Sequence, residues 1–140
     1  MGFLSNDVTD HQMTAKSYSP IAGCGVVDLP EAAEYDRRWL IVDEQGQWIS
    51  AAQCPALASV SMVMRMGNLV LRAPGMLRLE LPLDVIEDDD SVRRVARVGG
   101  QVVDVVDEGD VAATWFSNAA GVACRLVKVH PEAAPVGWPE

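Results

Sequence analysis

Short runs of apolar and β-branched residues alternate with turn residues from Met13 to Val106, and this spacing is typical of an antiparallel sandwich or barrel. In the run Met76–Leu83 the leucines fall at every second position, so one face of that strand is expected to be buried. The pair Gly99–Gly100 separates two such runs and suits a hairpin turn. The predicted strands are Met13–Ser19, Cys24–Leu29, Asp36–Val42, Gln47–Ser50, Ala56–Arg65, Asn68–Arg72, Met76–Leu81, Val92–Val98 and Gln101–Val106.

The hydrophobic period changes once, between Asp107 and Gly121. The apolar residues of this stretch fall on one helical face, at i, i+1, i+4, i+5 and i+8 counted from Val111. Asp107 can cap the first turn, and Gly121 suits the left-handed position after the last turn. The pattern therefore predicts one amphipathic helix, Asp107 to Gly121, followed directly by a strand at Val122–Val129.

These elements predict a mainly β fold, an antiparallel closed or nearly closed β-barrel with one α-helix in the C-terminal half of the chain. A length of 140 residues is within the usual size of one domain, and neither an internal repeat nor a long linker divides the chain. We expect residues 1–12 to form a flexible N-terminal tail, residues 13–129 the barrel domain, and residues 130–140 a proline-rich, extended or mobile C-terminal tail.

The charge balance excludes one class of partner. The formal net charge is -9, and a surface of this sign repels the phosphate backbone, so we expect no nucleic-acid binding. The acidic runs Glu87–Asp90 and Asp104–Asp110 are interpreted as solvated segments. No apolar run approaches the length of about 18 residues that a membrane-spanning helix needs. The polar N-terminus does not resemble an export signal, which favours a cytoplasmic location.

The residues that most often carry chemistry are sparse. The cysteines, Cys24, Cys54 and Cys124, are an odd number, lie far apart in sequence and form no CxxC pair, which argues against a disulfide framework and a zinc site. The histidines are His11 and His130, both near expected mobile ends, so we expect no catalytic residue and no metal ligand. Trp39, Trp48, Trp115 and Phe116 are spaced as core residues, whereas Trp138 falls in the tail, outside the expected core.

Several motifs, taken in order, resemble one known family. They are Met13–Ala15 with Ser19–Ile21, Tyr35–Asp43 (YDRRWLIVD), Ser50–Pro55 (SAAQCP), Leu69–Gly75 (LVLRAPG) and Asp107–Val127, which ends in CRLV. This series resembles the MOSC N-terminal β-barrel domain family. That domain precedes the catalytic MOSC domain in molybdenum-cofactor proteins such as the amidoxime reducing component and the C-terminal region of molybdenum cofactor sulfurase. The resemblance covers about Met13 to Val129 and implies a related fold and an association with this cofactor.

The resemblance also points to three site positions. In the family a Lys-Ser pair and the first arginine of the DRRW motif help to hold the anionic cofactor, and the matching positions here are Ala22, Gly23 and Arg37. Ala52 occupies a further arginine position of the family pattern. Each hydrogen bond to a charged group contributes about 1.5–3 kcal/mol, so losing these cations weakens such a site severely. We expect no cofactor on the isolated chain, and Arg37 to be either a vestigial anion contact or a surface charge beside Trp39.

Three functions follow as hypotheses. The first is a non-catalytic barrel module that binds a MOSC-domain protein or a small anionic ligand, because the metal-binding cysteine of the family lies in the MOSC domain. The second is one half of a split molybdenum enzyme, completed in trans by a MOSC domain. The third is an independent small-molecule-binding barrel. The empty cation positions favour the first hypothesis over the second.

Overall fold

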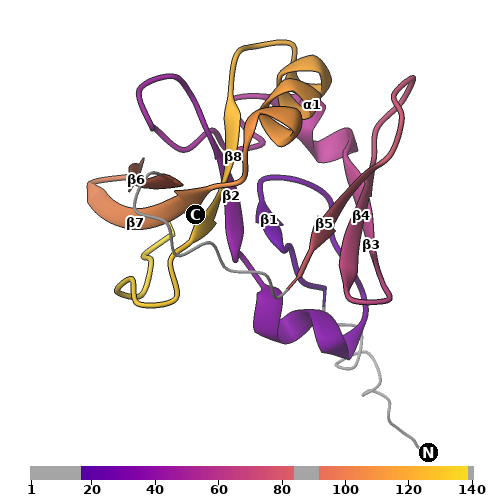
Figure 1. The fold of residues 1–140 in the computed structure, drawn as a ribbon, viewed down its shortest axis with the longest axis horizontal. Coiled ribbons are helices and arrows are strands. Elements are labelled where there is room, and N and C mark those ends of the chain that lie inside the picture. Colours follow the sequence, from indigo (N-terminus) through magenta and orange to yellow (C-terminus); the bar gives the residue numbers. More distant parts are fainter. Residues whose placement is uncertain (1–16, 84–91, 139–140) are drawn as a thin grey trace, which may run out of the picture.

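The structure is a computed structural model that describes residues 17–83 and 92–138. It contains a five-stranded sheet, a three-stranded sheet and one α-helix that lies above the space between them (Figure 1). The five-stranded sheet has the order β1 (Ile21–Ala22), β2 (Trp39–Val42), β8 (Arg125–Val129), β7 (Gln101–Asp107) and β6 (Arg93–Val98). The three-stranded sheet consists of β3 (Ser61–Arg65), β4 (Asn68–Arg72) and β5 (Leu79–Pro82). The helices are η2 (Pro30–Tyr35), η3 (Pro55–Ser59) and α1 (Asp110–Ala120), of which the first two are 3-10 helices.

Next to the glycine turns at Gly67 and Gly99–Gly100 the predicted strands agree with the structure, whereas the predicted strand Met76–Leu81 begins only at Leu79, the first residue of β5. The predicted strand Asn68–Arg72 has the same bounds as β4, and β6 and β7 each differ from their predictions by one residue at one end. Residues 24–29 and 47–50 form isolated bridges and loops instead of the predicted strands. Pro55 begins η3, so the predicted strand Ala56–Arg65 starts only at Ser61.

Part of the sequence prediction falls on residues that the structure does not describe. The predicted strand Met13–Ser19 lies mostly outside the described residues. The predicted tail 1–12, His11 and the acidic run Glu87–Asp90 lie wholly outside them.

The predicted closure into a barrel is not confirmed. Within residues 17–83 and 92–138 the two sheets remain separate, and neither closes on itself. The outer strand β6 is linked back toward β2 only through single bridges: the Trp48 amide donates to the Arg97 carbonyl at 2.8 Å, and the Arg97 amide donates to the Gly46 carbonyl at 2.8 Å. The predicted antiparallel pairing is confirmed for the other strand pairs of the described residues, and β1 alone pairs in parallel, with β2, across the crossover that contains η2.

Helix α1 is shorter at its N-terminus than predicted. It starts at Asp110 with Gly109 as its N-cap residue, so Asp107 does not cap the helix amides. Instead, an Asp107 carboxylate oxygen accepts a hydrogen bond from the Gly109 amide at 2.8 Å, two residues along the loop. The predicted C-terminus is confirmed, because Gly121 adopts the left-handed conformation with φ 78°.

Strands β2 and β8 are buried on both faces, and each face belongs to a different cluster. The main core lies on the side of α1 and the three-stranded sheet. It receives Trp39 and Ile41 from β2. The second cluster lies on the opposite side and receives Leu40 and Val42 from the same strand. The buried members of the second cluster are Ala22, Leu40, Val42, Ala96, Val98, Val103, Val105 and Val127. In the described residues, no helix is both long and apolar enough to cross a membrane.

Candidate functional site

The fold brings three segments into one neighbourhood: the loop with Ala22 and Gly23, the turn with Arg37, and Ser50–Pro55, which contains Ala52. The turn that contains Arg37 is fixed to the segment before β1, since the Arg37 amide donates to the Ser19 carbonyl at 2.8 Å. The Ser19 amide in turn donates to Asp36 Oδ1 at 2.8 Å, and the Trp39 amide donates to the Pro20 carbonyl at 2.9 Å. These bonds hold the Arg37 turn beside the loop that begins at Pro20.

The loop at Ala22 and Gly23 packs closely against the third segment, Ser50–Pro55. A β-carbon added to Gly23 would lie 3.4 Å from both the Ala51 amide nitrogen and the Ile49 carbonyl oxygen, and the backbone φ of Gly23 is +100°. Ala22 is buried in the second cluster at 3% exposure, and its carbonyl accepts a hydrogen bond from Trp48 Nε1 at 3.3 Å. Both positions are therefore packed backbone positions without a polar side chain of their own.

Arg37 lies against an indole ring contributed by the C-terminal tail. Its guanidinium carbon is 5.6 Å from the centre of the Trp138 ring, within the range of a cation–π contact. The Trp138 ring meets the Trp48 ring edge-on, with centroids 5.0 Å apart and an interplanar angle of 73°. We call Ala22, Arg37, Trp48 and Trp138 the tryptophan–arginine site. A hollow of about 550 Å³ adjoins it, lined by the 36–38 turn and the tail.

The tail is packed rather than outside the core, contrary to the sequence prediction for Trp138. Gln101 fixes it through two hydrogen bonds: its Nε2 donates to the Pro135 carbonyl and its Oε1 accepts from the Gly137 amide, both at 2.8 Å. His130, which was placed at a mobile end, is buried at 8% exposure and its amide donates to the Asp104 carbonyl. The tail therefore forms one wall of the tryptophan–arginine site.

The cysteines are far apart in sequence, but the fold gathers all of them at the main core. Burial, together with the nearby Cys124 and Cys54, raises the pKa of the Cys24 thiol to about 12. Burial also raises the pKa of Cys124, against the opposing effect of a hydrogen bond with Ser117. Thiols held protonated in this way are poor nucleophiles and poor metal ligands. Among the residues that the structure describes, no group of His, Cys, Asp or Glu is arranged to hold a metal ion.

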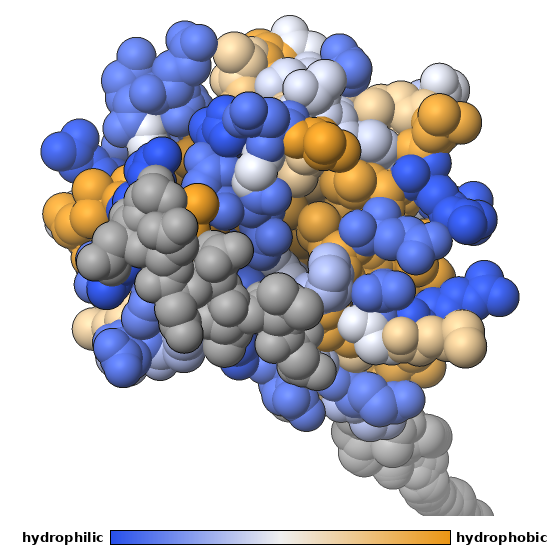
Figure 2. All heavy atoms as spheres, in the orientation of Figure 1, coloured by the Kyte–Doolittle hydropathy of each residue, from blue (hydrophilic) through white to orange (hydrophobic). Residues whose placement is uncertain are grey.

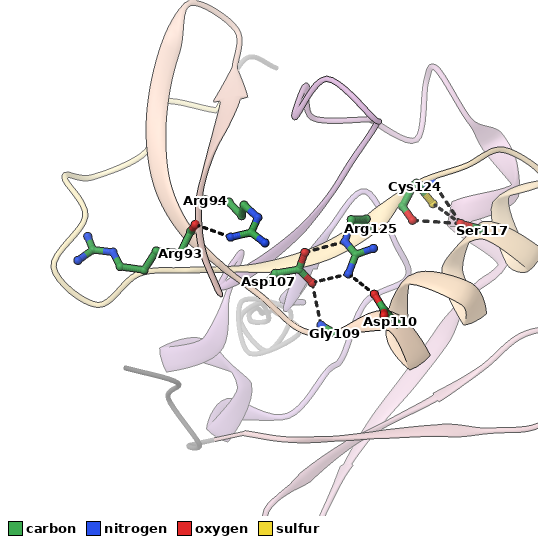
Figure 3. A network of polar contacts seen from close by, with 8 residues as sticks. All are labelled: Arg93, Arg94, Asp107, Gly109, Asp110, Ser117, Cys124 and Arg125. Atoms are coloured by element: carbon green, nitrogen blue, oxygen red, sulfur yellow. Dashed lines mark hydrogen bonds and ion pairs between the residues drawn. The ribbon is translucent and has the colours of Figure 1, made fainter. Parts of the chain in front are cut away.

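A charged network fixes the start of α1 to strands β7 and β8 (Figure 3). The Asp107 carboxylate accepts hydrogen bonds from Arg125 Nε at 2.6 Å and Nη2 at 3.1 Å, and Arg125 Nη2 also donates to Asp110 Oδ1 at 2.8 Å. Burial alone would raise the pKa of Asp107, but the hydrogen bonds from Arg125 and the Gly109 amide, with the charge of Arg94, lower it below its usual value. The same contacts raise the pKa of Arg125. This network is structural, because its groups satisfy one another.

Strand β8 contains a buried cation that the sequence pattern did not predict. Lys128 is 5% exposed, its Nζ donates to the Leu83 carbonyl at 2.7 Å, and it lies 4.8 Å from the centre of the Trp39 ring. Trp39 Nε1 donates to Glu108 Oε2 at 2.8 Å, so lysine, indole and carboxylate lie side by side. The only signal in the sequence was one lysine within an otherwise apolar run, Leu126–Val129.

Comparisons with known proteins identify relatives over most of the chain. Residues 16–123 match the family model of the MOSC N-terminal beta barrel domain. Molybdenum cofactor sulfurase of Danio rerio is 30% identical over 122 residues, which is 81% of this chain and 15% of that protein. Mitochondrial amidoxime reducing component 2 of Bos taurus is 35% identical over 108 residues, 76% of this chain and 32% of that protein.

A solved structure is also similar over nearly the whole chain. The solution structure of a Bordetella bronchiseptica protein is 61% identical, with a TM-score of 0.76, and the match covers 88% of this chain and 95% of that one. In contrast, the chain spans 15% and 32% of the lengths of the two curated relatives above.

Proposed function

This chain belongs to the MOSC N-terminal beta barrel domain family, and from that premise we propose that it is a non-catalytic binding module associated with molybdenum-cofactor proteins. Its ligand is a small anion or an acidic surface of a MOSC-domain protein, bound at the tryptophan–arginine site. A cytoplasmic location is part of the same proposal. The observation that carries it is the Arg37 guanidinium beside Trp138 at the hollow of about 550 Å³.

The composition of the site supports a small anion over a large phosphorylated cofactor. Ala22 is 3% exposed and Gly23 abuts the backbone of Ala51, so neither position offers a hydrogen-bond donor on a side chain. Arg37 and Arg38 are the cationic residues that line the hollow, beside Asp36. A guanidinium binds a planar or tetrahedral oxyanion through charge-assisted hydrogen bonds, and Trp138 shields one side of it from water.

A second candidate function is one half of a split molybdenum enzyme. The matched stretch is only 15% or 32% of the length of the two curated relatives, so in those proteins the domain is joined to a much longer chain. A MOSC-domain protein supplied in trans would provide what the family keeps in that longer chain. Under this reading the cofactor would be held mainly by the partner, because Ala22 and Gly23 contribute no cation.

The test is a titration of the labelled full chain with sulfate, followed by nuclear magnetic resonance. Sulfate should shift the amide signals of residues 36–38 and 130–138, and Arg37→Ala should abolish these shifts. Arg65→Ala is the matched control, since Arg65 is an exposed arginine on β3 that does not line the hollow. Shifts that survive Arg37→Ala, or that lie at the far end of the molecule, would contradict the proposed site.

A parallel test addresses the cofactor. We expect the purified chain to contain no molybdenum by elemental analysis and to show no saturable binding of the molybdenum–pterin cofactor at micromolar concentration. Stoichiometric molybdenum in the chain alone would overturn the argument from Ala22 and Gly23. Metal found only after mixing with a MOSC-domain protein would favour the split-enzyme reading.

A further inference from the structure

An apolar groove lies between helix α1 and the loop that joins β4 to β5. It has a volume of about 740 Å³, and its walls include Met76, Leu77, Val111 and Trp115. Leu77 is 88% exposed and Val111 is 76% exposed, which are high fractions for aliphatic side chains. Hydrophobic surface gathers on this face between α1 and the three-stranded sheet (Figure 2). The groove shares no lining residue with the hollow beside Arg37.

The groove is formed before any partner binds. Trp115 Nε1 donates to the Leu77 carbonyl at 2.7 Å, which ties the loop to the helix at the floor of the groove. The Trp115 ring packs edge-on against Phe116 with centroids 4.9 Å apart, so the main core fixes the indole. The Met76 amide donates to the Ala73 carbonyl at 3.1 Å and closes the loop itself. A site whose walls are already fixed loses little conformational entropy when it binds.

The surface around the groove is acidic. The Asp110 side chain lines the groove and is 93% exposed. On the other flank of α1 a hollow of about 670 Å³ has three carboxylates in its lining, Asp43, Glu44 and the same Asp110, against one cation, Arg125. Helix α1 carries no lysine or arginine, and the guanidinium of Arg125 beside it is held by Asp107 and Asp110. The exposed strip of α1 therefore separates an apolar groove from an acidic hollow.

We infer that this surface docks a separate polypeptide segment that presents one bulky apolar side chain next to basic residues. The apolar side chain fills the groove beside Leu77 and Val111, and the basic residues meet Asp43 and Glu44 on the other flank of α1. A second copy of this chain is a poorer occupant, because a chain of net charge -9 would bring the same carboxylates together. The inference goes beyond the anion site at Arg37 and does not depend on it.

A library of random 12-residue peptides displayed on phage, selected against the immobilised full chain, tests the inference. The selected sequences should share an apolar residue flanked by lysine or arginine. A synthetic peptide of that consensus should bind at least tenfold more weakly to Leu77→Ser and to Val111→Ser. Val102→Ser on β7 is the matched control, because Val102 is 62% exposed and lies outside the groove, and it should leave the affinity unchanged.

The contribution of the acidic residues to peptide binding is tested separately. Glu44→Gln should weaken the peptide several-fold, whereas Glu31→Gln in η2 should have no effect, and raising the salt concentration should weaken binding to the parent chain. An acidic consensus, or no selected peptide that loses affinity with Leu77→Ser, would overturn the inference. Dimerisation of the free chain that Val111→Ser abolishes would also overturn it, because a second copy would then occupy the groove. None of these outcomes changes the sulfate titration at Arg37, so the two proposals fail separately.

Discussion

The main core and the second cluster share strands β2 and β8 but are closed in different ways. On one face, Trp39 and Leu126 meet a helix and a three-stranded sheet, and a charged network fixes the start of that helix. On the other face, Leu40 and Val127 meet valines of β6 and β7 and are covered in part by an irregular tail. Two hydrogen bonds of one glutamine and the contacts of one indole hold that tail.

The two faces should differ in how much they contribute to the free energy of folding and in how easily their cover opens. A helix with satisfied ends buries large side chains at a fixed place, so the main core should carry most of the free energy of folding. A tail with few hydrogen bonds can open locally without unfolding the sheets. The proposed anion site lies under the tail, so a ligand there can compete with tail contacts at small cost to the fold.

The largest expected effect is a cavity in the main core. Phe116 is fully buried, so Phe116→Ala should lower the free energy of unfolding by about 3–5 kcal/mol, measured by guanidinium titration. The control is Val111→Ala on the exposed face of the same helix, which should change stability by less than about 0.5 kcal/mol. A loss near zero for Phe116→Ala would mean that the main core is not the principal source of stability.

The next effect concerns the charged network. Asp107→Asn removes the negative charge and one of the two carboxylate oxygens that accept from Arg125, and the Asp107 side chain is only 9% exposed, so we expect a loss of about 1.5–3 kcal/mol. Arg78→Ala breaks a pair with both side chains well exposed, 58% and 42%, and should cost at most about 1 kcal/mol. If Asp107→Asn and Arg78→Ala lowered the free energy of unfolding equally, the network would stabilise the fold no more than an exposed ion pair does.

The pKa of Asp107 predicts how stability changes with acid. Because the pKa is lowered in the folded chain, the stabilisation is fully present above the ordinary carboxyl pKa of about 3.9. It is lost as the pH falls through the lower folded-state value. Urea titrations between pH 7 and pH 2 should show that parent chain and Asp107→Asn differ at neutral pH and converge in acid. A difference that grows in acid would have the wrong sign.

A smaller effect is expected for the tail. Trp138→Ala removes a half-buried indole and an aromatic pair, which contributes about 0.5–1.5 kcal/mol beyond its buried area. Amide hydrogen exchange should accelerate at residues 133–137 in this variant, with little change in α1. A loss as large as that of Phe116→Ala would show that the second cluster depends on the tail as strongly as the main core depends on the helix.

The smallest effect is expected at Arg37. Its φ of 54° lies in the left-handed region, a conformation that costs alanine as much as arginine, so Arg37→Ala should shift stability by less than about 1 kcal/mol. Arg37→Gly should instead stabilise the chain by about 1 kcal/mol, since glycine adopts this conformation freely. Thermal melts of both variants measure the difference. Unfolding of Arg37→Ala would mean that the residue is a buried structural ion.

The sequence predicted what local periodicity and turn chemistry determine. Strand β4 follows from a short apolar run next to a tight turn, and the end of α1 follows from Gly121 in the left-handed region. It did not predict features that depend on distant partners. The loop at Trp48 pairs with Arg97, and the segment 24–29 meets Tyr18 only through one bridge. Such contacts leave no periodic signal in the sequence.

The candidate site could also be predicted only in part, because some of its contacts depend on residues far apart in the sequence. The resemblance grouped Ala22, Gly23 and Arg37, and hydrogen bonds from Arg37 to Ser19 and from Trp48 to Ala22 support that grouping. Neither the burial of Ala22 nor the position of Trp138 against Arg37 could be predicted from spacing, because the first depends on the packing of β1 within the second cluster and the second on how the tail folds back to Gln101. The buried Lys128 beside Trp39 likewise depends on the pairing of β2 with β8.

The edge-on contact of Trp48 with Trp138 gives the protein an optical reporter of its own. Two indoles with centres 5.0 Å apart are close enough for their excited states to couple, and such coupling contributes a paired band to circular dichroism in the ultraviolet. Release of the tail separates the rings, so this band should vanish while the signal of α1 persists. The state of the tail can therefore be followed in dilute solution without attaching a dye.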